Sequence, residues 1–201
     1  TSRSTLLLLP ATVQIRRDVT YTYACKHCEQ NACSTPVVEA NMPKPLIRGS
    51  IASPETVAHI MVQKFVMASP LYRQEQEWER RGIPLSRQTM SNWLLKCTED
   101  YLAPVYEVLK RQLVQHSVLH ADETTLQVLH EEGKTPQSKS YMWLYRTSGD
   151  AASQIILYEY QPDRKAEHPK TFLKDFHGYL HADGYSGYHS LPGTVTVVGC
   201  W

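Results

Sequence analysis

The sequence has little of what marks a membrane or secreted protein. No apolar run approaches the roughly 20 residues that a membrane-spanning helix needs. The run at residues 6–9 is too short and lacks the layout of a signal peptide. The five cysteines are an odd number without the regular spacing of a disulfide framework, which predicts a reducing, cytoplasmic setting. A starting Met is also missing and the chain stops just after a strand-like run, so we expect a piece of something longer.

A strong net charge is absent as well, because 21 Lys and Arg stand against 20 Asp and Glu. This balance hides an asymmetry along the chain. Residues 1–115 carry 14 basic and 10 acidic side chains, whereas residues 116–201 carry 7 and 10. A basic front half and an acidic rear half fit a nucleic-acid grip joined to a cation-binding site, and differences this small are also compatible with scatter. The 42% hydrophobic content is enough for a real core.

A strand-like segment at residues 11–24 leads into a Cys-x-x-Cys pair, Cys25 and Cys28. Two thiolates on one tight turn can occupy two corners of a tetrahedral zinc site, so the segment is typical of half a zinc ribbon. Cys33 and His27 are poorly spaced to complete the site. Inert cysteines and a redox pair are the alternatives, but no helical pattern follows to lower the thiol pKa of a redox pair.

Residues 36–52 are proline-rich with little periodicity and are predicted to be a linker after the zinc-ribbon-like segment at residues 1–35. Helical signals fill residues 53–115. Ser53 and Pro54 predict the start of one helix, with Val57, Ile60, Met61 and Phe65 as its apolar stripe. A second helix is predicted from about residue 71 to Arg81, ending at Gly82, and Ser86 caps a third whose inner face is Met90, Trp93, Leu94 and Cys97. A longer helix follows, with Leu102, Val105, Tyr106, Leu109 and Leu113 on one face.

A helix, a Gly-containing turn and a Ser-capped short helix form the outline of a helix-turn-helix, whose second helix reads the DNA major groove. Arg, Gln and Asn are the side chains that read guanine and adenine bidentately. An ordinary helical hairpin with a solvated polar face is the alternative. The residues expected to read bases are Arg87, Gln88, Ser91 and Asn92, and those expected to hold phosphates are Arg80, Arg81 and Lys96.

From residue 116 onward the apolar period becomes strand-like. Short loops join the first three predicted strands, which are therefore expected to be antiparallel. A short helix with Phe172, Leu173 and Phe176 separates them from two more strands. The predicted strands are residues 118–129, 141–145, 155–158, 179–183 and 195–200.

The tetrapeptide Leu-His-Ala-Asp occurs twice, at residues 119–122 and 180–183. Residues two apart in a strand share a face, so each His lies on the same side as its Asp. If the two strands are neighbours, Asp122 and Asp183 converge and need a cation between them, and their hard oxygens suit Mg²⁺ or Mn²⁺. The alternative is two strands that end in similar turn sequences.

Three antiparallel strands, a helix and two more strands follow the order of a ribonuclease H-like core, so the expected fold class is α/β with a mixed sheet. Beyond this order, stretches through nearly the whole chain resemble the insertion sequence 66 family of bacterial transposases. These stretches are Tyr23–Cys28, Leu71–Gln76, Leu85–Trp93, Leu119–Thr124, Tyr141–Trp143, Ala182–Tyr188 and Gly199–Trp201.

The resemblance implies a DDE-type enzyme that cuts and joins mobile-element ends, acting on double-stranded DNA as a homo-oligomer. Asp122 and Asp183 would be the first two acids of the triad and would hold Mg²⁺ or Mn²⁺. Cys25 and Cys28 would be the later half of the family's Zn²⁺-binding segment, and residues 71–97 its helix-turn-helix.

Two departures from the family pattern matter. The third acid, a Glu, is expected beyond Trp201, since Glu159, Glu167 and Asp175 are in the wrong part of the topology. The first zinc-ligand pair is missing before Thr1. We therefore expect the chain to bind DNA better than it cleaves it. A catalytically incomplete DNA-binding remnant is the rival interpretation, and a carboxylate-pair sugar hydrolase, which needs neither divalent metal nor helix-turn-helix, is a remote one.

Overall fold

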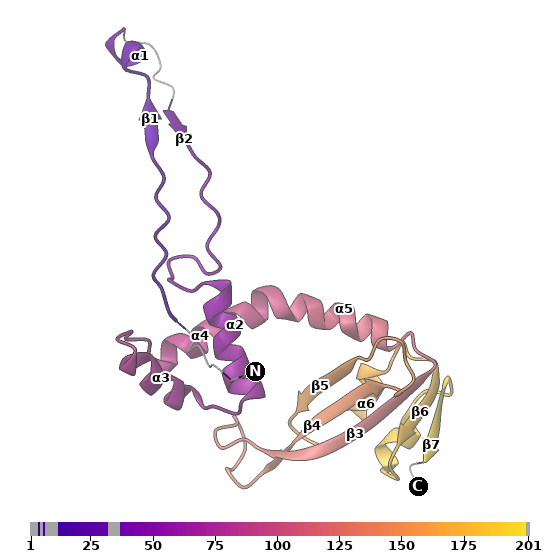
Figure 1. Ribbon diagram of the computed structural model, residues 1–201. Helices are drawn as coiled ribbons and strands as arrows, with labels where there is room; N and C mark the ends of the chain where they lie inside the picture. The colour runs from indigo at the N-terminus through magenta and orange to yellow at the C-terminus, as the bar shows by residue number, and fades with distance from the viewer. Residues whose placement is uncertain (1–3, 5, 7–11, 32–36, 200–201) are drawn as a thin grey trace. The chain divides into compact units, whose positions relative to one another are not determined.

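The computed structural model describes residues 4, 6, 12–31 and 37–199. Cys33, Cys200 and Trp201 lie outside the described residues. The chain divides into two compact units, residues 1–68 and 69–201 (Figure 1). Within the described residues, no helix is long and apolar enough to cross a membrane.

The first unit contains a two-stranded ribbon. Strand β1 (Thr22–Ala24) pairs antiparallel with β2 (Val37–Glu39), and helix α1 (Lys26–Gln30) follows β1. The long strand predicted at residues 11–24 is wrong in extent, and β2 falls inside the predicted linker. All the side chains of both strands are exposed, so the ribbon has no core against which a longer alternating strand could pack.

Helix α2 (Pro54–Met61) begins as predicted. The Ser53 side chain accepts a hydrogen bond from the Thr56 N–H, and Pro54 occupies the first turn. Val57 and Ile60 are buried. The predicted stripe does not reach Phe65, which is 70% exposed, because η1 (Val62–Val66) is π-helical and no longer follows the 3.6-residue period.

The second unit starts with the helices α3 (Leu71–Arg80) and α4 (Arg87–Cys97). Gly82 has a φ of +77°, which confirms its predicted role just after α3. The Ser86 side chain caps α4 by accepting a hydrogen bond from the Thr89 N–H. The predicted inner face of α4 is confirmed, because Met90, Trp93, Leu94 and Cys97 are all buried.

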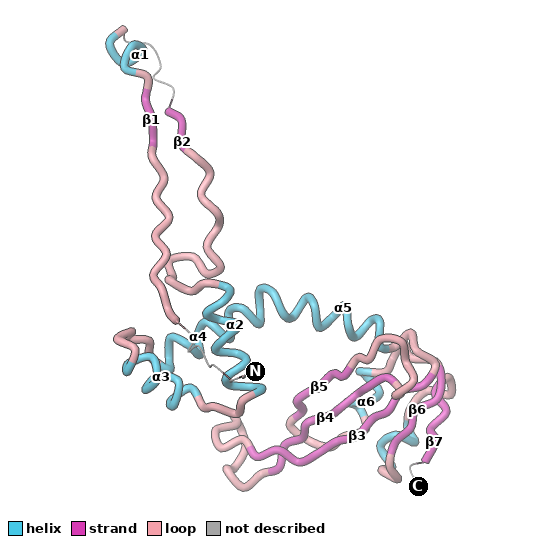
Figure 2. Tube along the Cα trace, viewed as in Figure 1, coloured by secondary structure: helices cyan, strands magenta, loops and turns pink. Residues whose placement is uncertain are grey.

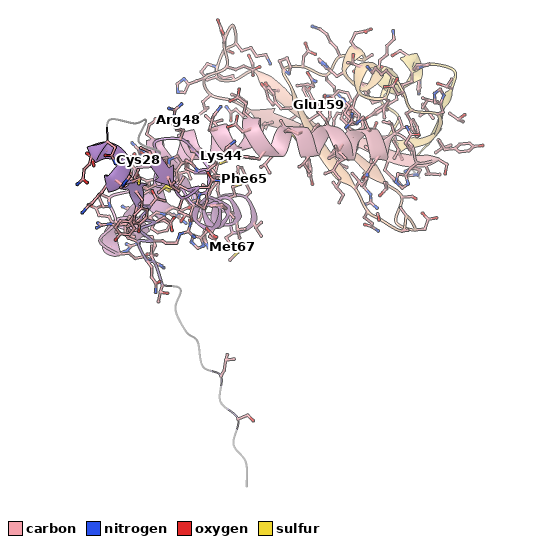
Figure 3. All side chains as sticks on the ribbon, turned by 90° about the horizontal axis from the view of Figure 1, so that it is seen from above. Cys28, Lys44, Arg48, Phe65, Met67 and Glu159 are labelled. Carbon is pink, nitrogen blue, oxygen red and sulfur yellow. The ribbon has the colours of Figure 1, made fainter. Side chains whose placement is uncertain are left out.

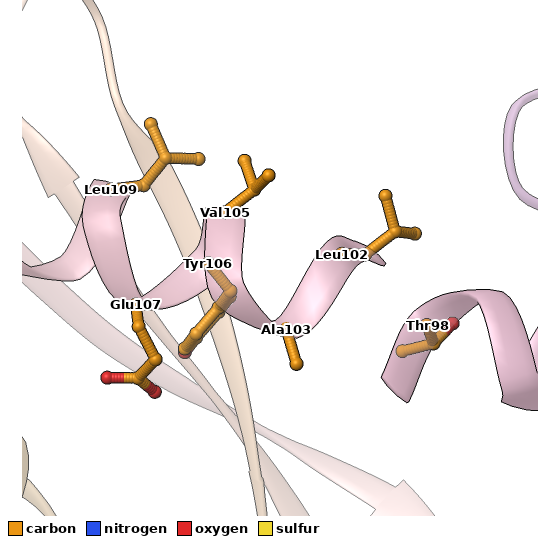
Figure 4. A pocket seen from close by; sticks show the side chains of 7 residues that line it. All are labelled: Thr98, Leu102, Ala103, Val105, Tyr106, Glu107 and Leu109. Carbon is orange, nitrogen blue, oxygen red and sulfur yellow. The ribbon is translucent and has the colours of Figure 1, made fainter. Parts of the chain in front are cut away.

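Helix α5 (Ala103–Leu113) follows the π-helical turn η2 (Thr98–Leu102). Its predicted apolar face is only partly buried. Leu102 and Val105 are 46% and 54% exposed and help to line an apolar pocket (Figure 4), whereas Leu113 is buried. The Tyr106 hydroxyl donates to the Tyr158 carbonyl at 3.2 Å, so α5 is joined to the sheet.

The second unit also contains a five-stranded mixed sheet (Figure 2). Its order is β5-β4-β3-β6-β7, with antiparallel pairs among β3, β4 and β5 and parallel pairs among β3, β6 and β7. The α/β class and the antiparallel first three strands are thus confirmed. The elements are β3 (Val118–Gln127), β4 (Lys139–Thr147), β5 (Ile156–Gln161), α6 (Glu167–Phe172), β6 (Gly178–Ala182), η3 (Ser186–Ser190) and β7 (Val195–Gly199).

One face of the sheet carries the core. In Figure 1, α6 lies behind β3, β4 and β5, and the ring of its Phe172 stacks on Tyr145 with 3.7 Å between ring centroids. Trp143 and Tyr145 are fully buried on this face. The opposite face is more open. Its large exposed side chains include Ile156, Tyr158, Tyr160 and Tyr179.

Candidate functional site

The two Leu-His-Ala-Asp copies meet in the sheet. Strands β3 and β6 are parallel neighbours, and His120 stands opposite His181 in their register. The centroids of the two imidazole rings lie 4.8 Å apart. Burial, together with the nearby charges of His181 and Arg146, lowers the pKa of His120. The sequence alone could not tell whether these strands were adjacent, and the structure brings them side by side.

Asp122 and Asp183 follow their histidines by two positions. The paired residues of β3 and β6 end at His120 and His181, so each Asp lies just past this paired stretch. Asp122 is exposed and accepts a hydrogen bond from the Glu123 N–H at 2.8 Å. The Asp183 side chain is 51% exposed and accepts from the Tyr185 N–H at 2.9 Å, which closes a short turn after β6. Both carboxylates therefore keep oxygen atoms open to solvent.

Glu123 is a site residue that the sequence reasoning did not single out. It lies on the core face of β3, and its side chain is 0% exposed. The Arg164 Nε–H donates to its carboxylate at 2.7 Å, and the Tyr188 hydroxyl donates at 2.6 Å. Burial and the hydrogen bond to Glu123 raise the pKa of Tyr188, so its hydroxyl keeps the proton that it donates to Glu123. The available signal was the alternation of the strand, in which Glu123 shares the face of the buried Leu119 and Ala121.

Arg164 reaches from Glu123 toward the second predicted acid. Its Nη2 pairs with Glu123 and lies 3.9 Å from Asp183 Oδ2. The guanidinium carbon sits 4.0 Å from the centre of the Tyr185 ring, and the Tyr185 hydroxyl donates to the Arg164 carbonyl. Tyr188 packs edge-on against the buried Trp143. A connected polar and aromatic cluster thus surrounds the turn that carries Asp183.

None of the three acids that the sequence excludes as the third acid, Glu159, Glu167 and Asp175, lies on β3 or β6. Glu159, which is labelled in Figure 3, is on β5, which β4 and β3 separate from β6. One of its buried oxygens has no hydrogen-bond partner. Glu167 is in α6, and the Asp175 side chain is 71% exposed beside Lys174. Among the residues that the structure describes, no three His, Cys, Asp or Glu side chains form a group able to hold a metal ion.

The predicted base-reading residues begin α4. Arg87, Gln88 and Asn92 are exposed, and Ser91 is half-buried. The Gln88 amide donates to the Asn92 side chain at 3.0 Å, and the backbone N–H of Arg87 donates to Glu75. The exposed amides and guanidinium are thus presented on one short helix, as a groove-reading helix requires.

The predicted phosphate-holding residues are paired within their own helical segments. Arg80 and Arg81 both contact Glu77, and Lys96 contacts Glu99 and Asp100. Exposed pairs of this kind contribute little to stability, typically less than about 1 kcal/mol, so a phosphate can compete for these cations.

The Cys-x-x-Cys pair lies at a helix start. Helix α1 begins directly after Cys25, so the expectation that no helix follows the pair is wrong. The Cys28 backbone N–H lowers the pKa of Cys25, and the hydrogen bond between the two thiols raises the pKa of Cys28. Figure 3 labels Cys28. The two cysteines form at most two corners of a zinc site within the described part of the chain.

Comparison with known proteins adds the family. Residues 49–201 match the transposase IS66 family. The uncharacterized protein y4qI of Sinorhizobium fredii (strain NBRC 101917 / NGR234) is 32% identical over 185 residues, which cover 82% of this chain and 33% of that protein. The uncharacterized protein y4jD of the same organism is 30% identical over 195 residues, or 95% of this chain and 37% of that protein.

The chain therefore spans about a third of the length of these curated relatives. No solved structure gives a significant match. On the strength of the match over residues 49–201, the chain belongs to the transposase IS66 family.

Proposed function

We propose that the chain is part of a DNA transposase in which Asp122 and Asp183 are two acids of a DDE-type active site. The observation that carries the proposal is the parallel pairing of β3 with β6, which sets His120 against His181 and leads both strands to a carboxylate. Family membership supplies the reaction class, the cutting and joining of mobile-element DNA.

The strand order supports the finer assignment of a ribonuclease H-like core. Three antiparallel strands are followed by a helix and by two strands that add in parallel on the other side of β3. In open sheets that contain parallel strands, ligand sites lie at the carboxyl ends of neighbouring strands. Asp183 directly follows the carboxyl end of β6, and Asp122 lies on the neighbouring β3.

The residues fit a divalent cation. Both carboxylates are solvent-accessible, and oxygen ligands of this charge suit Mg²⁺ or Mn²⁺. When bound, such ions lower the pKa of an attacking water or hydroxyl and offset the charge that develops on the leaving oxygen. Asp122 and Asp183 would hold them, and a third carboxylate, a Glu in the resemblance, completes the proposed triad.

The remaining parts of the proposal concern DNA and zinc. The capped helix α4 presents Arg87, Gln88 and Asn92 to solvent, which supports base reading by a helix-turn-helix. Cys25 and Cys28 would supply half of a Zn²⁺ site. Assembly as a homo-oligomer on the element ends is part of the same proposal.

Metal-dependent cleavage tests the proposal in the intact protein. A duplex that carries an element end is incubated with Mn²⁺, and strand cleavage and DNA protection are measured together. Asp122→Asn and Asp183→Asn are each expected to reduce cleavage by at least about 100-fold, since the lost charge stabilisation is worth several kcal/mol. Both variants should keep protection, because α4 is unaltered.

Asp175→Asn is the matched control, since its carboxylate is exposed on the loop after α6 and is expected to leave cleavage unchanged. Full cleavage by either active-site variant would contradict the proposal. Protection without cleavage by the unaltered protein would identify the DNA-binding remnant instead.

A further inference from the structure

We propose that Arg164 is a positioning residue that holds the Asp183 turn against β3, and this inference rests on the proposed function. The inference is based on the Arg164 guanidinium, which contacts the buried carboxylate of Glu123 on β3 and also approaches Asp183 after β6. Arg164 belongs to neither strand. It lies in the loop between β5 and α6 and joins two segments that are 60 positions apart in the sequence.

Arg164 is anchored on β3 by the carboxylate of Glu123. Glu123 is the residue directly after Asp122, and its side chain is fully buried. A buried carboxylate needs a charged or hydrogen-bonding partner, and here Arg164 and Tyr188 supply both. The Arg164 guanidinium is therefore fixed to the stretch of β3 that carries the first acid.

Tyr185 connects Arg164 to the turn that carries Asp183. The Tyr185 ring lies 4.0 Å from the guanidinium carbon, and the Tyr185 hydroxyl donates to the Arg164 carbonyl. The N–H of this same Tyr185 donates to the Asp183 carboxylate. Three interactions thus connect Arg164 to the turn after β6: its guanidinium lies over the Tyr185 ring, its carbonyl accepts the Tyr185 hydroxyl, and its charge attracts Asp183.

Arg164 also lies close to the carboxylate of Asp183. The Arg164 Nη2 atom is 3.9 Å from Asp183 Oδ2, which is near enough for charge attraction but longer than a direct hydrogen bond. Asp183 keeps half of its side-chain surface open. The guanidinium can therefore orient the carboxylate without occupying the oxygens that a cation would bind, as outer-shell partners of metal ligands do.

The test measures Mn²⁺ affinity, from the electron paramagnetic resonance signal of the free ion, and the thermal midpoint of unfolding in the intact protein. An Asp122→Asn/Asp183→Asn variant defines which binding belongs to the proposed site. Arg164→Met is expected to lower affinity at that site about 10- to 100-fold. Arg164→Lys keeps the charge but loses the planar pair of N–H donors. Its Mn²⁺ affinity should therefore fall between those of the unaltered protein and Arg164→Met.

A double variant, Glu123→Gln/Arg164→Met, separates positioning from stability because it removes the buried charge together with its partner. We expect its thermal midpoint to recover while its Mn²⁺ affinity stays low. Arg111→Met, on the exposed surface of α5, is the control and should change neither quantity.

Recovery of both quantities in the double variant, or unaltered affinity in Arg164→Met, would overturn the positioning role alone. If the unaltered protein shows no Mn²⁺ binding that depends on Asp122 and Asp183, the proposed function and this inference fall together.

Discussion

Single side chains around Glu123 illustrate how a charge can be kept inside a sheet protein. Its carboxylate is enclosed by one guanidinium and one phenol, Arg164 and Tyr188, which contact different oxygens. Hydrogen bonds to charged groups contribute roughly 1.5–3 kcal/mol, more than bonds between neutral groups. The cluster is therefore both a stability element and the support of the turn that carries Asp183.

Removing the hydroxyl of Tyr188 tests the energy of its hydrogen bond to Glu123. Tyr188→Phe is expected to lower the free energy of unfolding by about 1.5–3 kcal/mol in urea denaturation, because one buried carboxylate oxygen loses its donor. Tyr179→Phe is the matched control, since the side chain of Tyr179 is exposed on β6. In a Glu123→Gln background the effect of Tyr188→Phe should shrink, and an unchanged effect there would show that the hydrogen bond to the Glu123 carboxylate is not responsible.

Asp163 is expected to make the stability of the protein depend on pH in the acid range. Hydrogen bonds from Lys165 and His168 lower the pKa of Asp163 from 3.8 to about 2. Because the folded-state pKa is below the unfolded value, the stabilisation is complete above about pH 4 and is lost as the pH falls toward 2. Urea denaturation between pH 5 and pH 2 should show this loss, and Asp163→Asn should reduce the slope. An identical slope in the variant would contradict the assignment.

At the scale of elements, the local capping and turn signals were predictable, whereas burial was only partly so. Ser86 and Gly82 mark their boundaries by chemistry that needs no tertiary context. Leu102 and Val105 have the spacing of an inner face and yet stay largely exposed, because spacing alone does not say which partner covers a helix.

The cap on α4 offers a direct check. Ser86→Ala should lower the free energy of unfolding by about 1 kcal/mol, because the Thr89 N–H loses its acceptor. Ser86→Asp, which can accept the same bond, should be close to the unaltered protein in the same denaturation experiment. Equal losses in both variants would show that the hydroxyl does not act as a cap.

The start of β6 depends on one glycine. Gly178 has a φ of +154°, and a Cβ there would meet the Ser117 carbonyl oxygen at 2.3 Å. Gly178→Ala is therefore expected to cost more than about 2 kcal/mol, since backbone must move to relieve the contact. Gly199→Ala meets nothing within 4 Å and should be nearly neutral. Equal thermal midpoints for the two variants would contradict the close approach of β6 to residue 117.

For the whole molecule, the sequence predicted the order of elements along the chain and the antiparallel pairing of the first three strands, but it predicted the site incompletely. The repeated tetrapeptide pointed to Asp122 and Asp183, because a sequence repeat can be recognised without knowing which residues pack around it. Glu123 and Arg164 escaped notice because their pairing is set by the return of a distant loop to β3. No local pattern in the sequence encodes a contact of that kind.

DNA recognition is a prediction at the same scale. Arg87→Ala should weaken binding to an element end by about 1–3 kcal/mol and relax base preference at one position, as measured by competition binding at fixed salt. Arg111→Ala is the matched control on α5. A uniform loss across all DNA sequences would show that Arg87 holds a phosphate and does not read a base.

The proposed active site requires a cation shared by Asp122 on β3 and Asp183 directly after β6. Anomalous diffraction from crystals of the intact protein grown with Mn²⁺ tests this directly. We expect an anomalous peak within about 2.0–2.4 Å of carboxylate oxygens from both Asp122 and Asp183. A fully occupied peak bound elsewhere, with the two carboxylates pointing away from each other, would contradict the account.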